Sequence, residues 1–382
     1  MINYFPLEYG GGGEYSAVTI LNNLSHRYDI TYYSSTNFVG YVRLKEEDVK
    51  SMISFKYIRT GFVHPGWNVF NRFFRPMPPL DLICDFDAVV IFVDRPISGK
   101  ILKQLSRSTK VLFLLHGLTI ETFSSRSIRK DIIALYTRVI GALFTMSLKK
   151  ACKENISLQV FNQVQKTLLL NSGIPDQQIF DIPMGVDFKN YSVGTNRDKF
   201  IVTYLGRLES LTKGSLFLPK VARKLMKADS SIELHVVGSG GQLQKLRKLT
   251  SKIPNVKMLG YLDEGNKIEE LKQSSLLIVT SNIEPFSVAI LEGLASGLPA
   301  VALRASGPSS IISSSETFGT ISNYDASEFV RKILLYKHQW DVDKNEFIEE
   351  KSNRAALAKE LFDLPIFIDG YAKMFESILG SN

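Results

Sequence analysis

The sequence predicts an α/β fold with two doubly wound domains. Short apolar segments alternate with segments of helical periodicity along most of the 382 residues, which is typical of parallel sheets covered by helices on both faces. The length exceeds the usual limit of a single hydrophobic core, which favours two domains. The alternation also forms two series, separated by a polar stretch at residues 192–199. We therefore expect two such domains facing each other across a cleft.

The individual elements follow from apolar runs and helical periodicity. In the first series, strands are predicted at 2–5, 30–34, 88–93, 111–115 and 158–161, and helices at 14–24 and 128–150. In the second, strands are predicted at 200–205, 232–237, 256–259, 276–280 and 300–303, and helices at about 215–228, 241–252, 266–274 and 288–296. These series place an N-terminal domain at 1–196 and a C-terminal domain at 197–364, with an amphipathic helix at 365–382 that we expect to pack on the first domain.

The composition is that of a globular protein with a basic N-terminal half. The formal net charge is +8, and residues 1–196 hold 22 Lys/Arg against 16 Asp/Glu, whereas residues 197–382 hold 24 against 22. A basic half suits an anionic partner, such as a phospholipid, a phosphorylated acceptor or nucleic acid. No nucleic-acid-binding motif is present, so we predict no nucleic-acid partner.

Cysteine usage and the first residues predict a cytoplasmic protein. Cys84 and Cys152 form neither a disulfide framework nor a metal-ligand pattern, so we expect free thiols in a reducing compartment. The first residues lack the basic and long apolar regions of a signal peptide. No uninterrupted apolar run reaches about 18 residues, so no spanning helix is predicted.

The most informative segment is Glu284-Pro-Phe-Ser-Val-Ala-Ile-Leu-Glu292. It opens the predicted helix at 288–296, which is apolar on nearly every side and is therefore buried. Glu292 is the only charge on this helix, and a buried carboxylate is costly unless a protein cation or a ligand with hydroxyl donors satisfies it. Two simpler interpretations stay open, namely a structural ion pair for Glu292 and a solvated loop acid for Glu284.

Glycines and a histidine follow predicted strands of the first half. A glycine run at residues 10–13, which includes Gly12 and Gly13, lies between the first strand and a helix. Glycines let the backbone approach a ligand and a helix N-terminus favours an anion, although a flexible turn explains the run equally well. His116 directly follows the strand at 111–115, where ligands bind in such sheets, but a lone histidine is more often structural.

Two cations follow the first strand of the second half. Arg207 and Lys213 lie in the loop after strand 200–205, and Gly238 begins a glycine cluster after the next strand. Arginine binds a diphosphate through a planar fork and lysine binds it as a point charge, so this pair can clamp a diphosphate. Two solvated surface cations are the alternative. Because no metal-ligand cluster is present, we predict phosphate binding by basic residues, with no metal and no other cofactor.

The ordered set of motifs resembles the retaining glycosyltransferases of family 4. The set comprises Arg207 with Lys213, the glycines at 238–241, Gly260-Tyr261, Glu284-x7-Glu292 and Ser296-Gly297-Leu298-Pro299. The resemblance is densest at 200–312 and weaker in the first half. Met184 stands where the family usually has Asn, Gly293 where it often has Ala, and the segment 305–310 has serine where it usually has glutamate. The resemblance implies the GT-B fold of two facing Rossmann-like domains.

The resemblance also implies roles for the candidate residues. Arg207 and Lys213 would hold the donor diphosphate, Glu284 would accept from hydroxyls of the transferred sugar, and Glu292 would accept from the ribose. The backbone amides of Phe286, Ser287 and Val288 would face the diphosphate or the sugar, and Gly238 would let the backbone approach the donor closely. Tyr261 would border the base and His116 would lie beside the sugar. Gly12 and Gly13 would line the diphosphate or acceptor side.

The predicted activity is retaining hexosyl transfer from a UDP- or GDP-linked sugar. The acceptor would be a glycan or a lipid-linked glycan, as in N-glycan or surface-polysaccharide assembly. The mechanism usually proposed for this family is a front-face mechanism, in which the leaving phosphate helps to deprotonate the acceptor hydroxyl. A nucleotide-sugar epimerase of the same fold and a catalytically silent binding subunit are the alternatives.

Two basic, apolar segments of the first domain suggest contact with a membrane. Residues 55–76 and 124–153 mix Lys and Arg with bulky apolar side chains, and such segments can dock on an anionic bilayer. Core-packing helices with a solvated basic face are the alternative. Our hypothesis is peripheral contact with the inner face of the cell membrane, which carries the acceptor.

Overall fold

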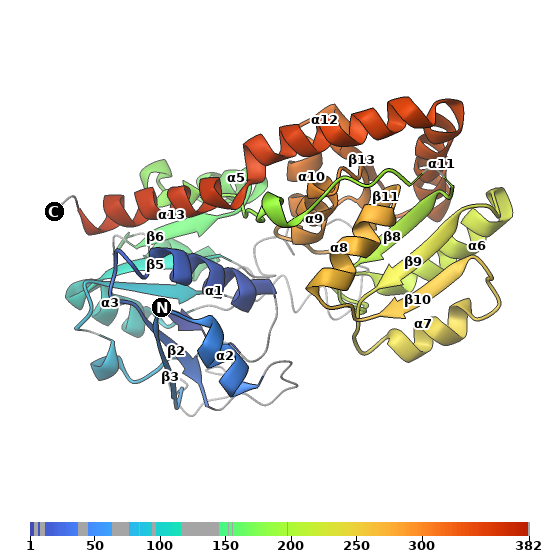
Figure 1. Cartoon of the computed structure of the whole chain (residues 1–382). Coiled ribbons are helices and arrows are strands. Elements are labelled where there is room, and N and C mark those ends of the chain that lie inside the picture. Colours follow the sequence, from blue (N-terminus) through green and yellow to red (C-terminus); the bar gives the residue numbers. More distant parts are fainter. Residues whose placement is uncertain are drawn as a thin grey trace. The chain divides into compact units, whose positions relative to one another are not determined.

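The chain divides into two compact units, one of residues 1–183 with 367–382 and one of residues 184–366 (Figure 1). The structure is a computed structural model. It describes residues 1–3, 7, 12–36, 45–62, 76–83, 85–93, 97–115, 145–151, 153–154, 156–196 and 198–380, and the side chains of residues 12–16 are not described. The predicted residue His116, both cysteines, most of the predicted helix at 128–150 and most of the two basic, apolar segments lie outside these ranges.

The first unit contains a seven-stranded parallel sheet with the order β3-β2-β1-β4-β5-β6-β7. Its strands are β1 (Ile2–Asn3), β2 (Thr31–Ser35), β3 (Lys56–Thr60), β4 (Ala88–Phe92), β5 (Lys110–Leu114), β6 (Ser157–Val160) and β7 (Ile179–Asp181). Its described helices are α1 (Gly12–Leu24), α2 (Glu46–Met52), α3 (Gly99–Ser108), α5 (Gln163–Asn171) and, from Phe367 on, α13 (Leu364–Leu379).

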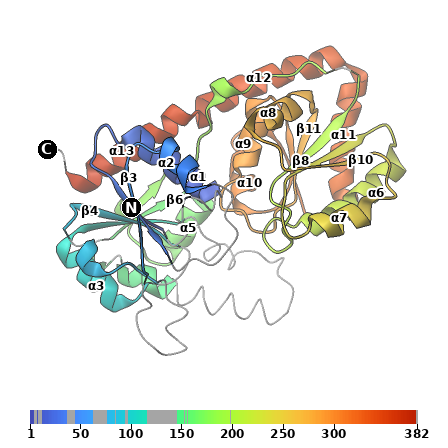
Figure 2. The same ribbon diagram turned by 60° about the horizontal axis from the view of Figure 1, so that its bottom comes forward.

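The second unit contains a six-stranded parallel sheet with the order β10-β9-β8-β11-β12-β13. Its strands are β8 (Ile201–Leu205), β9 (Glu233–Val237), β10 (Val256–Gly260), β11 (Leu276–Val279), β12 (Ala300–Leu303) and β13 (Gly319–Ser322). Its helices are α6 (Leu218–Ala228), α7 (Leu243–Thr250), α8 (Glu264–Gln273), α9 (Val288–Ala295), α10 (Ser306–Ile312), α11 (Ala326–Val342) and α12 (Lys344–Phe362). Figure 2 shows α6, α7 and α11 on one face of this sheet and α8 and α9 on the other.

The strands form where apolar residues run without interruption. β11 and β12 are buried along their whole length, as expected for strands covered on both faces. Each of the ten predicted strands overlaps an observed one, whereas β3, β7 and β13 carry no such run. β3 is an edge strand without a buried residue, which explains why its sequence gives no buried-strand signal.

The structure divides the chain earlier than the polar stretch at 192–199 suggests. Residues 184–196 pack on the second unit: Val186 pairs with the backbone at Phe362 and Asp363, and the Gly194 carbonyl accepts from Lys351 Nζ at 3.0 Å. The boundary therefore lies at 183/184, because backbone pairing and not local polarity decides where this segment packs.

The C-terminal helix α13 packs within the first unit. The ring of Phe375 lies 5.9 Å from that of Tyr28, and Lys110 Nζ donates to the Leu379 carbonyl at 2.6 Å. Its buried residues form the apolar stripe seen in the sequence, with Phe367, Tyr371 and Phe375 among them. Within the described ranges, no helix is long and apolar enough to span a membrane.

Candidate functional site

The candidate residues of the second unit follow the carboxyl ends of its strands. Arg207 comes after β8, Gly238 after β9, Tyr261 after β10, and Glu284 follows β11. Since every pairing in this sheet is parallel, these ends lie at one edge. The strand order reverses between β8 and β11, and ligands of open α/β sheets bind at this kind of switch point.

Glu284 and Lys213 meet at the switch point. Lys213 Nζ donates to Glu284 Oε2, and Ser281 Oγ donates to the same oxygen at 2.9 Å. The side chain of Glu284 is only 9% exposed, so it is not the solvated loop acid that the sequence left open. No described residue donates to its second oxygen, Oε1.

Backbone bonds join the two loops that carry this pair. The Asn282 amide donates to the Thr212 carbonyl at 2.7 Å, and Thr280 Oγ1 donates to the Lys213 carbonyl at 3.0 Å. Gly214 has a φ of +59°, and a Cβ there would lie 2.1 Å from the Thr280 carbonyl oxygen. Only glycine permits both this backbone conformation and this approach, which is how residues 71 positions apart come into contact.

Glu209 organises the Lys213 loop, and the sequence analysis missed it. Its carboxylate accepts from the backbone amides of Leu211 at 2.5 Å and Thr212 at 2.9 Å, and from the Thr212 hydroxyl. Burial raises the pKa of Glu209, but these donors outweigh burial and hold the pKa below its usual value. A charged Glu209 therefore fixes the loop that presents Lys213.

Arg207 and Gly238 lie where β8 and β9 approach closely. The side chain of Arg207 is exposed, and its carbonyl accepts from the Tyr204 hydroxyl at 3.0 Å. Burial, together with the Glu284 and Glu209 carboxylates, raises the pKa of Tyr204, so this phenol stays a donor. A Cβ on Gly238 would lie 1.9 Å from the Gly206 carbonyl oxygen, so this position requires glycine.

Glu292 has a protein cation beside it. Lys267 Nζ on α8 lies 2.6 Å from Glu292 Oε1. The Tyr191 hydroxyl lies 3.3 Å from the same oxygen and 3.3 Å from Glu264 Oε1, so the two carboxylates share its proton. Of the two interpretations that the sequence left open, the structural ion pair is therefore present. No described residue donates to Glu292 Oε2, so the ion pair leaves one oxygen open to a ligand.

The N-terminus of α9 places Phe286, Ser287 and Val288 after Glu284. Ser287 is the N-cap residue and its side chain makes no cap hydrogen bond. The Phe286 ring is buried, 6.5 Å from the ring of Phe362, so only its backbone can serve a ligand. The Gly307 amide donates to the Glu284 carbonyl at 2.9 Å and holds this loop in place.

The remaining predicted residues follow other strands of the two sheets. Tyr261 follows β10 with 69% of its surface exposed. Gly12 and Gly13 begin α1 in the first unit, after the first strand as predicted. Among the described residues, no three of His, Cys, Asp and Glu gather as a metal site, and binding of the diphosphate without a metal stays a prediction.

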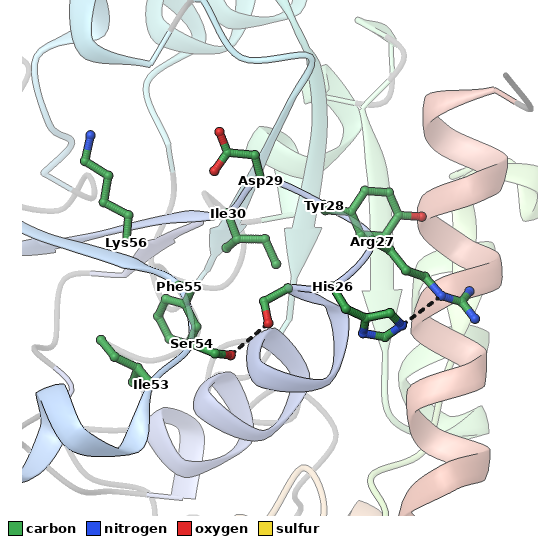
Figure 3. Close-up of a pocket in the computed structure, with 10 residues that line it drawn as sticks. His26, Arg27, Tyr28, Asp29, Ile30, Ile53, Ser54, Phe55 and Lys56 are labelled. Carbon is green, nitrogen blue, oxygen red and sulfur yellow. Dashed lines mark hydrogen bonds between the residues drawn. The ribbon is translucent and has the colours of Figure 1, made fainter.

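A separate pocket of about 560 Å³ lies in the first unit (Figure 3). It is lined by residues 25–30, which precede β2, and by residues 53–56, which precede and begin β3. Ser25 Oγ lies 2.7 Å from Ser54 Oγ, and Arg27 Nε donates to His26 Nε2 at 3.3 Å. The pocket is thus at the amino edge of its sheet, opposite the edge at which such sheets bind ligands.

Comparison with known proteins relates the second unit to glycosyltransferases. Residues 187–354 match the family Glycosyl transferases group 1, and the switch-point residues lie within this range. The chain is 28% identical over 214 residues to poly(ribitol-phosphate) alpha-N-acetylglucosaminyltransferase of Staphylococcus aureus, with 53% of this chain and 42% of the relative covered. It is 22% identical over 248 residues to UDP-Gal:alpha-D-GlcNAc-diphosphoundecaprenol alpha-1,3-galactosyltransferase of Escherichia coli, with 62% of each covered.

A solved structure extends the likeness to the whole chain. Alr3699/HepE of Anabaena, in complex with UDP and glucose, superposes with a TM-score of 0.68 at 14% identity, covering 98% of both chains. The fold is GT-B. The similarities support a glycosyltransferase, as the motifs predict, whereas membership of family 4 stays a prediction. The chain spans 38–62% of the length of four curated glycosyltransferases that it matches.

Proposed function

We propose that the protein is a retaining hexosyltransferase that uses a UDP- or GDP-linked sugar and a glycan or lipid-linked glycan acceptor. The observation that carries the proposal is the Lys213–Glu284 pair at the switch point of the second sheet. An exposed arginine, Arg207, follows the neighbouring strand. The site therefore combines cations for a diphosphate with a carboxylate for sugar hydroxyls.

Each part of the donor has a matching group in this proposal. Arg207, Lys213 and the amides at the start of α9 bind the diphosphate, which is anionic and suits both cations and a helix N-terminus. Glu284 Oε1 accepts from a sugar hydroxyl, and Glu292 Oε2 accepts from the ribose. Tyr261 borders the base, because an exposed aromatic ring at the strand end offers a stacking surface.

The proposed chemistry is a front-face substitution. The bond between the anomeric carbon and the diphosphate oxygen breaks, the acceptor oxygen attacks the same face, and its proton passes to the departing diphosphate. Lys213 and Arg207 stabilise the negative charge that develops on the leaving group. The protein supplies positioning and electrostatic stabilisation, and retention follows from attack on the face that the leaving group vacates.

Two features support the acceptor class. The names of the two bacterial relatives describe transfer of N-acetylglucosamine to poly(ribitol-phosphate) and of galactose to a diphosphoundecaprenol-linked sugar, and both of these acceptors carry phosphate. The N-terminal half of this chain has an excess of six basic residues. An acceptor that carries phosphate, whether a lipid-linked glycan or a polymer, suits this charge.

A nucleotide-binding screen and a hydrolysis assay test the proposal. A cognate nucleoside diphosphate or nucleotide sugar should raise the melting temperature. Glu284→Gln and Arg207→Ala should each lower donor hydrolysis roughly tenfold or more, because a hydrogen bond to a charged group contributes about 1.5–3 kcal/mol. Arg223→Ala, an exposed arginine on α6, is the matched control. Unchanged hydrolysis in both site variants would refute the site, and an inverted product anomer would refute retention.

A further inference from the structure

The contacts of Glu292 point to a residue outside the sequence motifs. We propose that Lys267 is a positioning residue of the donor site: it holds one oxygen of Glu292, so that the other oxygen is presented, ionised, to the ribose hydroxyls of the bound nucleotide. The inference rests on the proposed function, because it concerns the same donor site.

The geometry that supports this role is one-sided. Lys267 Nζ lies 2.6 Å from Glu292 Oε1, and both side chains are largely buried, at 14% and 13% exposure. The Tyr191 hydroxyl also lies 3.3 Å from this same oxygen, and its single proton is shared with Glu264 Oε1 at 3.3 Å. Both contacts are made to Oε1, and Oε2 accepts none from the described residues. The carboxylate is thus fixed in rotation and keeps one acceptor oxygen available.

Glu284 is held in the same one-sided way. Lys213 and Ser281 both donate to its Oε2 and leave Oε1 without a donor among the described residues. In each case a lysine from another element and a hydroxyl group hold one oxygen of the carboxylate. The repetition indicates that a lysine–hydroxyl pair orients each of the two glutamates of the motif.

The charged groups around Glu292 leave Lys267 as its ion-pair partner. Glu264 on α8 is mostly exposed and pairs with Lys267 at 2.8 Å. α12 also packs on α9, but its buried cations Lys351 and Arg354 donate to backbone carbonyls, including those of Ser274 and Gly297. Among the described residues, Lys267 is therefore the one cation in a salt bridge with Glu292.

Removing Lys267 should make Glu292 sensitive to pH. Burial raises the pKa of Glu292, and the Lys267 ammonium opposes that rise. Burial also disfavours the charge on Lys267, but Glu292 and Glu264 outweigh it and raise the pKa of Lys267. Without the ammonium, only the Tyr191 hydroxyl opposes burial and the Glu264 charge, so the pKa of Glu292 rises further and Glu292 takes up a proton at higher pH. A protonated carboxyl accepts hydroxyl hydrogens more weakly than a carboxylate does.

The test compares nucleotides with and without ribose hydroxyls. Calorimetry measures Kd for UDP and 2′,3′-dideoxy-UDP, and in parallel for GDP and 2′,3′-dideoxy-GDP, at pH 6.5 and pH 9. The ratio of the two Kd values isolates the ribose hydroxyls, because titration of the phosphates affects both members of a pair. We expect wild type to prefer the ribose form by roughly tenfold or more at both pH values, since these hydrogen bonds go to a carboxylate.

The variants separate positioning from a merely structural role. Lys267→Met should lose most of this preference at pH 6.5 and regain it at pH 9, whereas Lys267→Arg should keep it at both. Glu292→Gln should lose it at both. Lys272→Met, which removes an exposed lysine of the same helix, should match wild type. Lys267→Gln replaces the methionine variant if that variant fails to fold by circular dichroism.

Three results would overturn the proposal. In the first, Lys267→Met keeps the wild-type ratio at pH 6.5. In the second, Lys267→Met loses the preference for the ribose form at both pH values and Lys267→Arg does not keep that preference, which indicates that Lys267 has a structural role only. In the third, Glu292→Gln keeps the ratio, so that Glu292 is not the ribose ligand. A wild-type protein that binds neither nucleotide would instead overturn the proposed function itself.

Discussion

Lys351 on α12 makes the stability of the second unit depend on pH in a predictable direction. Lys351 is only 3% exposed. Its ammonium group donates to the Gly194 carbonyl at 3.0 Å and to the Ser274 carbonyl at 3.1 Å. Burial, with a smaller contribution from Arg354, lowers the pKa of Lys351 from 10.5 to about 8. The folded state therefore binds this proton less tightly than the unfolded state does.

The sign and size of the effect follow from linkage. Between pH 8 and 10.5 the unfolded state binds more protons at this lysine, so the free energy of unfolding rises with pH. At about 1.36 kcal/mol per unit of pKa, the lowered pKa changes the free energy of unfolding by about 3 kcal/mol across this pH range. This stabilisation is fully present above pH 10.5 and is lost as the pH falls to 8.

Urea unfolding of wild type and Lys351→Met at several pH values measures this pH-dependent part of the unfolding free energy. Trp340 is buried in the second unit, so fluorescence in a Trp67→Phe background reports that unit. The difference in unfolding free energy, wild type minus variant, should rise by about 3 kcal/mol between pH 8 and 10.5. Lys359→Met, an exposed lysine on the same helix, should show no such rise. A difference that does not change with pH would refute the reasoning.

Three further predictions concern single residues of the second unit. Gly214→Ala should lower the free energy of unfolding by about 1–3 kcal/mol and weaken nucleotide binding, because Gly214 has a left-handed backbone and lies next to the Thr280 carbonyl. Gly241→Ala, whose added Cβ would meet nothing within 4 Å, is the control in thermal unfolding. An equal loss of stability in both variants would contradict the prediction. Glu209→Gln should weaken nucleoside diphosphate binding several-fold while the melting temperature changes little, because the Lys213 loop loses its charged acceptor; unaltered calorimetric affinity would argue against this. Burial opposes the charge on His235, but Glu270 and Glu233 outweigh burial and raise the pKa of His235 above 6.5. The stabilisation from the charged His235 is therefore present below pH 6.5 and is lost as the pH rises through the folded pKa. In urea unfolding, His235→Gln should lower the free energy of unfolding more at pH 6 than at pH 9, and equal losses would disprove the prediction.

Local sequence signals were sufficient for most of the sheet and for the edge that holds the site. Apolar residues fill β11 and β12 and make up most of β8 and β9, because strands covered on both faces bury mainly apolar side chains. The sequence does not predict β3 and β13, because both are edge strands without an apolar run: β3 has no buried residue, and β13 consists of Gly-Thr-Ile-Ser. The sequence places the domain boundary too late, because the polar stretch begins at residue 192 whereas the segment from residue 184 already packs on the second unit.

The sequence alone is enough to show which residues follow the strands of a parallel sheet. It therefore places four candidate residues at one edge: Arg207, Gly238, Tyr261 and Glu284. It also showed that Glu292, the lone charge on an apolar helix, needs a partner. The folded structure was needed to show that Lys267 is that partner and that, among the described residues, none donates to the second oxygen of either glutamate. A contact between side chains of different helices has no periodicity or spacing in a single sequence, so packing alone can reveal it.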